Sequence, residues 1–194
     1  NNIDVNVYLL TEFTSEQMEQ IRYGLQKNIN VGIYATPKFT WRQMREIRHG
    51  LELGLDVTIY TKPEFEWDQM VEIRLGLEQK LDVLWYINPE FTWEQMLQIR
   101  GGLEKGLDVS IYDDNSKYNF EQMKIIRVGL EDGIDVSWYA KPEFDYKQMS
   151  EIFLGLSEGL DVSIYAKPNI SANEMVKQRH KLELKKEFNR KLSK

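Results

Sequence analysis

The stretch Phe39–Tyr60, FTWRQMREIRHGLELGLDVTIY, recurs along almost the whole chain. Its copies align on their methionine, and successive methionines stand 26 or 27 residues apart. Self-similarity at such a period is typical of proteins that stack one structural unit on the next. The sequence therefore predicts an array of about seven units. All seven methionines of the chain occupy this one position: Met18, Met44, Met70, Met96, Met123, Met149 and Met175.

Each copy carries its own signals for the start and the end of a helix. Thr40 and Gln43 form a capping box, in which each side chain binds a free backbone amide of the first turn. Gly54 stands where the helix should end, because glycine takes the left-handed conformation without strain. The sequence therefore predicts a helix from about Trp41 to Leu53. Equivalent capping pairs are Thr14/Gln17 and Thr92/Gln95; equivalent stop residues are Asn28, Gly106, Gly133 and Gly159, and Lys80 departs from this pattern.

The segment after each stop, LDVTIY at residues 55–60, alternates apolar and polar side chains and predicts a strand. Parallel strands joined by helices form right-handed crossovers. We therefore expect a right-handed α/β solenoid of about seven 26-residue strand–helix repeats. Its parallel sheet should form the concave face and its helices the convex face. A closed βα barrel is the alternative, disfavoured because it would bury the Asp and Tyr residues of every strand in its lumen.

The two ends of the chain depart from the repeat. We expect one solenoid domain over residues 1–170, beginning with a bare strand, Ile3–Tyr8, whose open edge could pair with a second copy. Residues 171–194 hold eight Lys or Arg against three Glu and predict a basic capping helix. A nucleic-acid-binding tail is the less favoured alternative, because aromatic residues do not alternate with the basic ones. The insertion at 113–117, DDNSK, is either a tolerated surface loop or a contact loop.

Two further columns recur within the helices. One is a glycine in mid-helix, such as Gly50 and Gly76, which costs up to about 1 kcal/mol relative to Ala. We expect it to permit close packing between neighbouring helices. The other is an arginine, such as Arg48 and Arg74, which we expect to pack along the Trp column and pair with carboxylates of the next repeat.

Composition and motifs indicate a non-enzymatic, cytoplasmic protein. The chain has no cysteine, a net charge of −6 and only two histidines, His49 and His180. It contains no phosphate-binding loop, zinc-protease motif or serine elbow. No apolar run approaches the ~20 residues of a membrane span. We expect no catalytic residues, no metal and no cofactor.

The predicted sheet would carry a column of Asp beside a column of Tyr on its concave face. A ladder of like charges repels and favours a cationic partner, and Tyr offers contact area at low entropic cost. We therefore expect a protein-interaction scaffold that binds a partner with a basic segment; direct nucleic-acid binding and membrane binding are not expected. The predicted binding residues are Asp56, Thr58, Tyr60, Asp82, Leu84, Tyr86, Asp108, Ser110, Tyr112, Asp135 and Tyr139.

The repeat has the pattern P-x-F-x-W-x-Q-M-x-x-I-R-x-G-L-E-x-G-L-D-V-S-x-Y over residues 11–170. It resembles uncharacterised repeats in proteins of Firmicutes phages and conjugative elements. The expected architecture is similar to the leucine-rich-repeat horseshoe, although the leucine-rich motif itself is absent. The resemblance implies a second hypothesis for function: an inhibitor of a host defence or DNA-binding protein that acts by acidic DNA mimicry.

Overall fold

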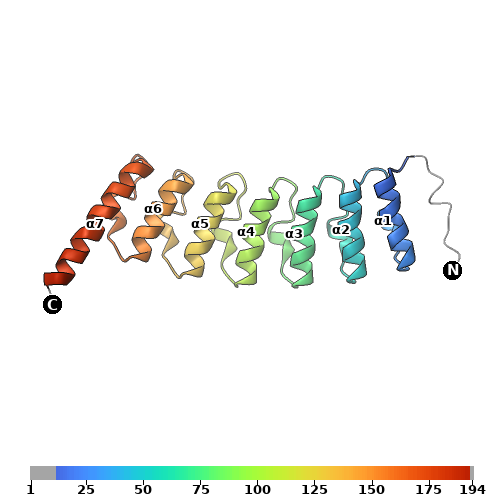
Figure 1. The fold of residues 1–194 in the computed structure, drawn as a ribbon, viewed down its shortest axis with the longest axis horizontal. Coiled ribbons are helices and arrows are strands. Elements are labelled where there is room, and N and C mark those ends of the chain that lie inside the picture. Colours follow the sequence, from blue (N-terminus) through green and yellow to red (C-terminus); the bar gives the residue numbers. More distant parts are fainter. Residues whose placement is uncertain (1–11, 193–194) are drawn as a thin grey trace. The chain divides into compact units, whose positions relative to one another are not determined.

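The structure, a computed structural model, describes residues 12–192 and shows only helices in them (Figure 1). The predicted α/β solenoid is therefore wrong: these residues contain no strand, and the repeats of about 26 residues are helical. Six 3₁₀ helices stand where strands were expected: η2 (Val31–Ile33), η3 (Val57–Ile59), η4 (Val83–Trp85), η5 (Val109–Ile111), η6 (Val136–Trp138) and η7 (Val162–Ile164). The α-helices are α1 (Ser15–Gln26), α2 (Trp41–Glu52), α3 (Trp67–Glu78), α4 (Trp93–Glu104), α5 (Phe120–Glu131), α6 (Tyr146–Ser157) and α7 (Ala172–Leu192).

The helix boundaries follow the predicted signals. At the start of α2 the Thr40 side chain accepts from the Gln43 amide at 3.3 Å, and Gln43 Oε1 accepts from the Thr40 amide at 2.7 Å, which confirms the capping box. At its end Gly54 has φ of 70°. The amide of Leu55 donates to the carbonyl of Gly50 at 2.9 Å, and the Gly54 amide donates to Leu51 at 3.1 Å. These two bonds are a Schellman motif, which satisfies the last carbonyls of the helix.

The segment Asp56–Tyr60 forms a capped 3₁₀ turn because its aspartate offers the backbone a closer partner than a sheet would. Asp56 Oδ1 accepts from the Thr58 amide at 3.1 Å, and the Tyr60 amide donates to the Val57 carbonyl at 3.1 Å. Asp side chains that bind the amide two residues on start turns and compete with extended structure. The buried residues are Val57 and Tyr60, three apart, which is the period of a 3₁₀ helix and not of a strand.

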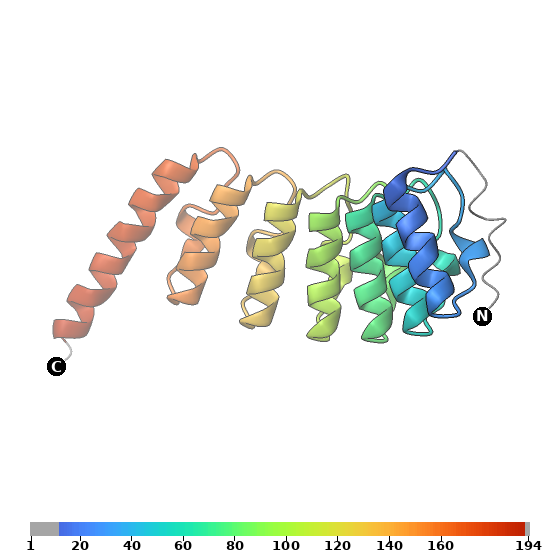
Figure 2. The ribbon, with the colours of Figure 1, turned by 45° about the vertical axis from the view of Figure 1, so that its right-hand side comes forward.

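The chain divides into two compact units, Asn1–Arg100 and Gly101–Lys194, with the boundary inside α4. In the first unit α1 packs on α2 and α2 on α3. In the second unit α5 packs on α6 and α6 on α7, and Figure 2 shows the loops that join successive helices. From α2 to α6 the repeating Met and Ile of each helix are buried, with the aromatic residue before the helix and Val and Tyr of the 3₁₀ turn. Each repeat therefore contributes one small apolar cluster to the core of its unit.

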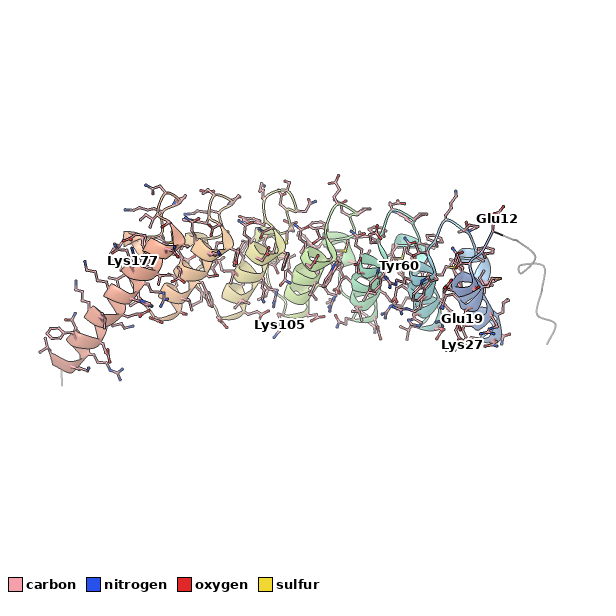
Figure 3. The ribbon with its side chains drawn as sticks, turned by 45° about the horizontal axis from the view of Figure 1, so that its top comes forward. Glu12, Glu19, Lys27, Tyr60, Lys105 and Lys177 are labelled. Carbon is pink, nitrogen blue, oxygen red and sulfur yellow. The ribbon has the colours of Figure 1, made fainter. Side chains whose placement is uncertain are left out.

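The structure describes only one of the two predicted terminal features. The N-terminal strand Ile3–Tyr8, with the pairing edge expected of it, lies outside the described residues. Helix α7 covers most of the segment that was predicted as a basic cap. That this segment is a separate domain stays a prediction. Its second half exposes Leu184, Phe188 and Leu192. Glu12 and Lys27 mark the two ends of α1 in Figure 3.

Candidate functional site

The aspartates predicted to form a binding ladder are exposed, and each caps a 3₁₀ turn. Asp56 also accepts from the Thr58 hydroxyl at 2.6 Å, and these bonds hold the pKa of Asp56 below its ordinary value. Asp108 holds Ser110 in the same way through the serine amide at 3.1 Å. The column is therefore explained by local folding and requires no partner. The same amide bond is made by Asn30, Asp82, Asp135 and Asp161.

The tyrosines predicted to lie beside them are core residues. Tyr60, labelled in Figure 3, is 0% exposed, and its hydroxyl donates to the backbone carbonyl of Glu46 at 3.3 Å. Burial raises the pKa of Tyr165 to about 12, because the phenolate would lose its hydration there. Tyr86, Tyr112 and Tyr139 are equally buried. The predicted Asp/Tyr face therefore does not exist as a surface, since its sheet is absent and its tyrosines point inward.

The mid-helix glycine makes room for this tyrosine. A Cβ added at Gly76 would lie 1.9 Å from the Tyr86 hydroxyl and 2.9 Å from Val83 Cγ1. These atoms belong to the turn that follows the same helix. The expectation that the glycine serves packing between neighbouring helices is therefore wrong. The same relation holds at Gly24, Gly50, Gly102, Gly129 and Gly155.

The glutamine of each QM pair joins one repeat to the next, a role that the sequence analysis missed. Besides closing the capping box, Gln43 donates through Nε2 to the carbonyl of Phe65 at 2.6 Å and to that of Pro63 at 3.3 Å. In α7, Glu174 takes this position. The equivalent donations run from Gln17 to Phe39, Gln69 to Phe91, Gln122 to Phe144 and Gln148 to Ile170.

The arginine column also joins repeats. Each arginine pairs with a residue of the preceding repeat, and not with one of the next repeat as expected. Arg74 donates to the buried carboxylate of Glu46 at 3.1 Å, and Arg100 donates to Glu72 at 2.8 Å. Between α5 and α6 the same two positions hold Ile125 and Phe153, whereas between α6 and α7 Arg179 donates to Glu151 at 2.8 Å. An apolar pair thus replaces a polar one, which identifies the arginine as a packing and pairing residue.

The first helical residue is aromatic in five consecutive repeats and remains partly exposed. In the first unit it is Trp41, Trp67 and Trp93, here called the tryptophan row, and Trp93 is 40% exposed. In the second unit Phe120 and Tyr146 take this position. These rings are less buried than the Met, Ile, Val and Tyr residues of the same repeats. Partly exposed aromatic rings are typical of contact surfaces.

The tryptophan row is filled at one place and hollow at the next. The Arg42 guanidinium lies 5.3 Å from the Trp41 ring centroid and 5.2 Å from the Trp67 ring centroid. One repeat further on, a hollow of about 240 Å³ opens on this surface. Its lining residues are Trp67, Asp68, Val71, Glu72 and Trp93. The hollow is therefore mostly apolar, with two acidic residues among its walls.

The remaining residues of the predicted binding surface lie in the 3₁₀ turns and not in the tryptophan row. Leu84, at the middle of η4, is 77% exposed, and Thr58 and Ser110 are exposed beside their aspartates. In the 113–117 insertion Asp114 accepts from the amides of Ser116 at 3.0 Å and Lys117 at 3.2 Å. The Lys117 and Ser116 side chains lower the pKa of Asp114 to about 2. The insertion is thus a turn held by its own hydrogen bonds. Whether it is a tolerated surface loop or a contact loop stays a prediction.

Residues 12–192 contain no group of three or more His, Asp or Glu side chains arranged to hold a metal ion. None of the helices in this range combines the length and the apolar character that a bilayer crossing requires. Comparison of the chain with family models, curated proteins and solved structures found no match.

Proposed function

We propose that this chain is a non-enzymatic scaffold that binds a partner polypeptide through the tryptophan row of its first unit. The observation that carries the proposal is the open hollow between Trp67 and Trp93, two aromatic rings that remain partly exposed. The other recurring columns have structural roles: Asp caps turns, Gly accommodates Tyr, and Gln and Arg join repeats. The tryptophan row has no such structural role, and we therefore assign partner binding to it.

The preferred partner carries a basic segment. The chain has a net charge of −6, and the second helical residue beside Trp67 and Trp93 is acidic, Asp68 and Glu94. Opposite charges steer association and suppress wrong partners. We also propose a cytoplasmic location, which rests on the absence of cysteine from the sequence.

A displayed library of random 15-residue peptides tests the proposal without knowledge of the natural partner. Selection on the intact chain should enrich basic peptides. Their affinity should fall by roughly 30-fold in a Trp67→Ser/Trp93→Ser variant, as expected when aromatic anchors are removed from an interface. Trp138→Ser is the matched control, because Trp138 is 37% exposed but lies in the second unit.

Two results would contradict the proposal: no enrichment of any peptide on the wild-type chain, or enriched peptides that bind the double variant as tightly as the wild type. Thermal melts of each variant show whether the fold persists, and only variants that melt near the wild type enter the comparison.

A further inference from the structure

The chain itself shows which chemical group fits between two neighbouring rings of the tryptophan row. Between α2 and α3 the Arg42 guanidinium lies within 5.3 Å of both the Trp41 and the Trp67 ring centroids. Arg45 adds a second cation, 5.8 Å from the Trp41 centroid. A cation within about 6 Å of an aromatic centroid is attracted by the negative face of the ring. The space between the Trp41 and Trp67 rings is here called the first place. It is occupied by an arginine of the chain itself.

Between α3 and α4 both cations are replaced. The residue equivalent to Arg42 is Asp68, and the residue equivalent to Arg45 is Val71. No side chain of residues 12–192 fills this second place, which is the hollow of about 240 Å³. This hollow is large enough for a planar guanidinium group.

The charge at the second place is the opposite of that at the first. Asp68 lies in the hollow's wall, with Oδ1 accepting from the Gln69 amide at 2.9 Å. Glu72 also lines the hollow, and its carboxylate accepts from Arg100 at 2.8 Å. Two aromatic walls with a carboxylate between them match the planar, multiply donating guanidinium group better than the compact ammonium of lysine.

We propose that the hollow formed by Trp67, Trp93 and Asp68 is a socket for an arginine side chain of a partner polypeptide. This inference rests on the proposed scaffold function and specifies its chemistry. The arginine stacks between the two indoles, as Arg42 does one repeat earlier, and its guanidinium faces the Asp68 carboxylate. The partner therefore supplies in trans the cation that α2 supplies in cis.

The indole N–H signals of the five tryptophans, followed by nuclear magnetic resonance, report on the socket directly. The probe is the peptide acetyl-Gly-Arg-Gly-amide, compared with its citrulline counterpart, which has nearly the same shape without the charge. The arginine peptide should shift the Trp67 and Trp93 signals saturably and leave Trp138 unchanged. The citrulline peptide should bind roughly 5- to 30-fold more weakly, as loss of a cation–π contact implies.

Two variants test the internal mimicry. Asp68→Arg should fill the socket from within and abolish the response of Trp93, whereas Glu64→Arg, the same charge change at an exposed loop residue, should preserve it. Arg42→Asp/Arg45→Val, which gives the first place the residues of the second, should open a second socket, so that the Trp41 signal now responds to the arginine peptide. If Asp68→Arg fails to fold, Trp93→Ser serves as the variant without a socket, and in it the Trp67 signal should no longer respond to the arginine peptide.

Equal binding of the arginine and citrulline peptides, or an unchanged response in folded Asp68→Arg protein, would overturn the socket. The scaffold can survive that result. Library-selected peptides that lose affinity in the Trp67→Ser/Trp93→Ser variant, yet keep it when their arginines are replaced by citrulline, would support the scaffold and refute the arginine socket.

Discussion

At the scale of single residues, one glycine and one tyrosine define the shape of each repeat. The tyrosine hydroxyl occupies the space in which a Cβ of the glycine would lie, so neither residue can change alone. In α4 the added Cβ of Gly102 would lie 2.0 Å from the Tyr112 hydroxyl. The neighbouring Gly101 has ordinary space, with Arg127 Cδ at 3.6 Å. The two adjacent glycines therefore offer a matched comparison.

Gly102→Ala should destabilise the protein by about 1–3 kcal/mol, because it overpacks the site of the Tyr112 ring. Gly101→Ala should instead stabilise it by up to about 1 kcal/mol through helix propensity. Adding Tyr112→Phe should recover part of the loss at Gly102, since contacting residues couple by about 0.5–3 kcal/mol. Urea-unfolding midpoints of these three variants, of Tyr112→Phe alone and of the wild type measure these differences. Equal effects of the two alanine substitutions would contradict the tyrosine–glycine account.

His49 gives stability a dependence on pH. Burial lowers its pKa below the ordinary value, and the adjacent Arg48 adds to the effect, while Glu46 and Glu52 oppose it and Arg74 reinforces it. The folded state therefore binds a proton less readily than the unfolded state, whose histidine titrates near about 6.5. The stabilisation is fully present above that pH and is lost as the pH falls below it.

Replacing His49 with Gln should reduce the loss of stability between about pH 7.5 and pH 5.5. Unfolding midpoints at both pH values measure this loss, with His180→Gln, at the exposed histidine of α7, as a control for the substitution itself. A His49→Gln variant that loses as much stability on acidification as the wild type would contradict the assignment.

At the scale of elements, the strand prediction failed because two patterns coincide in LDVTIY. Alternation and β-branched residues favour a strand, but β-propensity depends strongly on context. Asp56, followed two residues later by Thr58, favours a turn, and the buried pair Val57 and Tyr60 has the spacing of a 3₁₀ helix. The helix boundaries were predictable because capping boxes and left-handed stop residues depend on neighbouring residues alone.

The QM glutamine gives a prediction at this scale. In an ordinary capping box Glu serves as well as Gln at the third position, and a negative charge near a helix N-terminus is favourable. Here Gln43 must also donate to the Phe65 and Pro63 carbonyls of the next repeat. A carboxylate has no hydrogen to donate. In a Gln43→Glu variant the two carbonyl oxygens would therefore lose their hydrogen-bond donor and face a negatively charged group.

Gln43→Glu should therefore cost about 1–3 kcal/mol, the penalty for leaving buried polar groups unsatisfied. Glu174→Gln, the reverse change in the last helix of the chain, should be nearly neutral. Urea-unfolding midpoints for the pair provide the measurement. If Gln43→Glu leaves stability unchanged, the glutamine acts as a cap only and does not join the repeats.

At the scale of the whole chain, the period of the methionines was enough to predict a repeat protein, and the structure has helices at that spacing. The arrangement that holds repeats together was not predictable, since the Gln43–Phe65 and Arg74–Glu46 contacts span 22 and 28 residues. The filled and hollow places of the tryptophan row were hidden for the same reason. Arg42 and Asp68 differ visibly in the sequence, but only the packing of neighbouring helices shows that they face Trp rings.

The central claim of this account is that Asp56–Tyr60 and its copies are capped 3₁₀ turns whose tyrosines pack against their own helices. Proton–proton contacts in the intact chain, measured by nuclear Overhauser spectroscopy, test it most directly. We predict sequential amide–amide contacts from Val57 to Tyr60, and contacts between the Tyr60 ring and the α protons of Gly50. Backbone contacts between Val57 and Val83, which parallel strands about 4.8 Å apart would bring together, would contradict it.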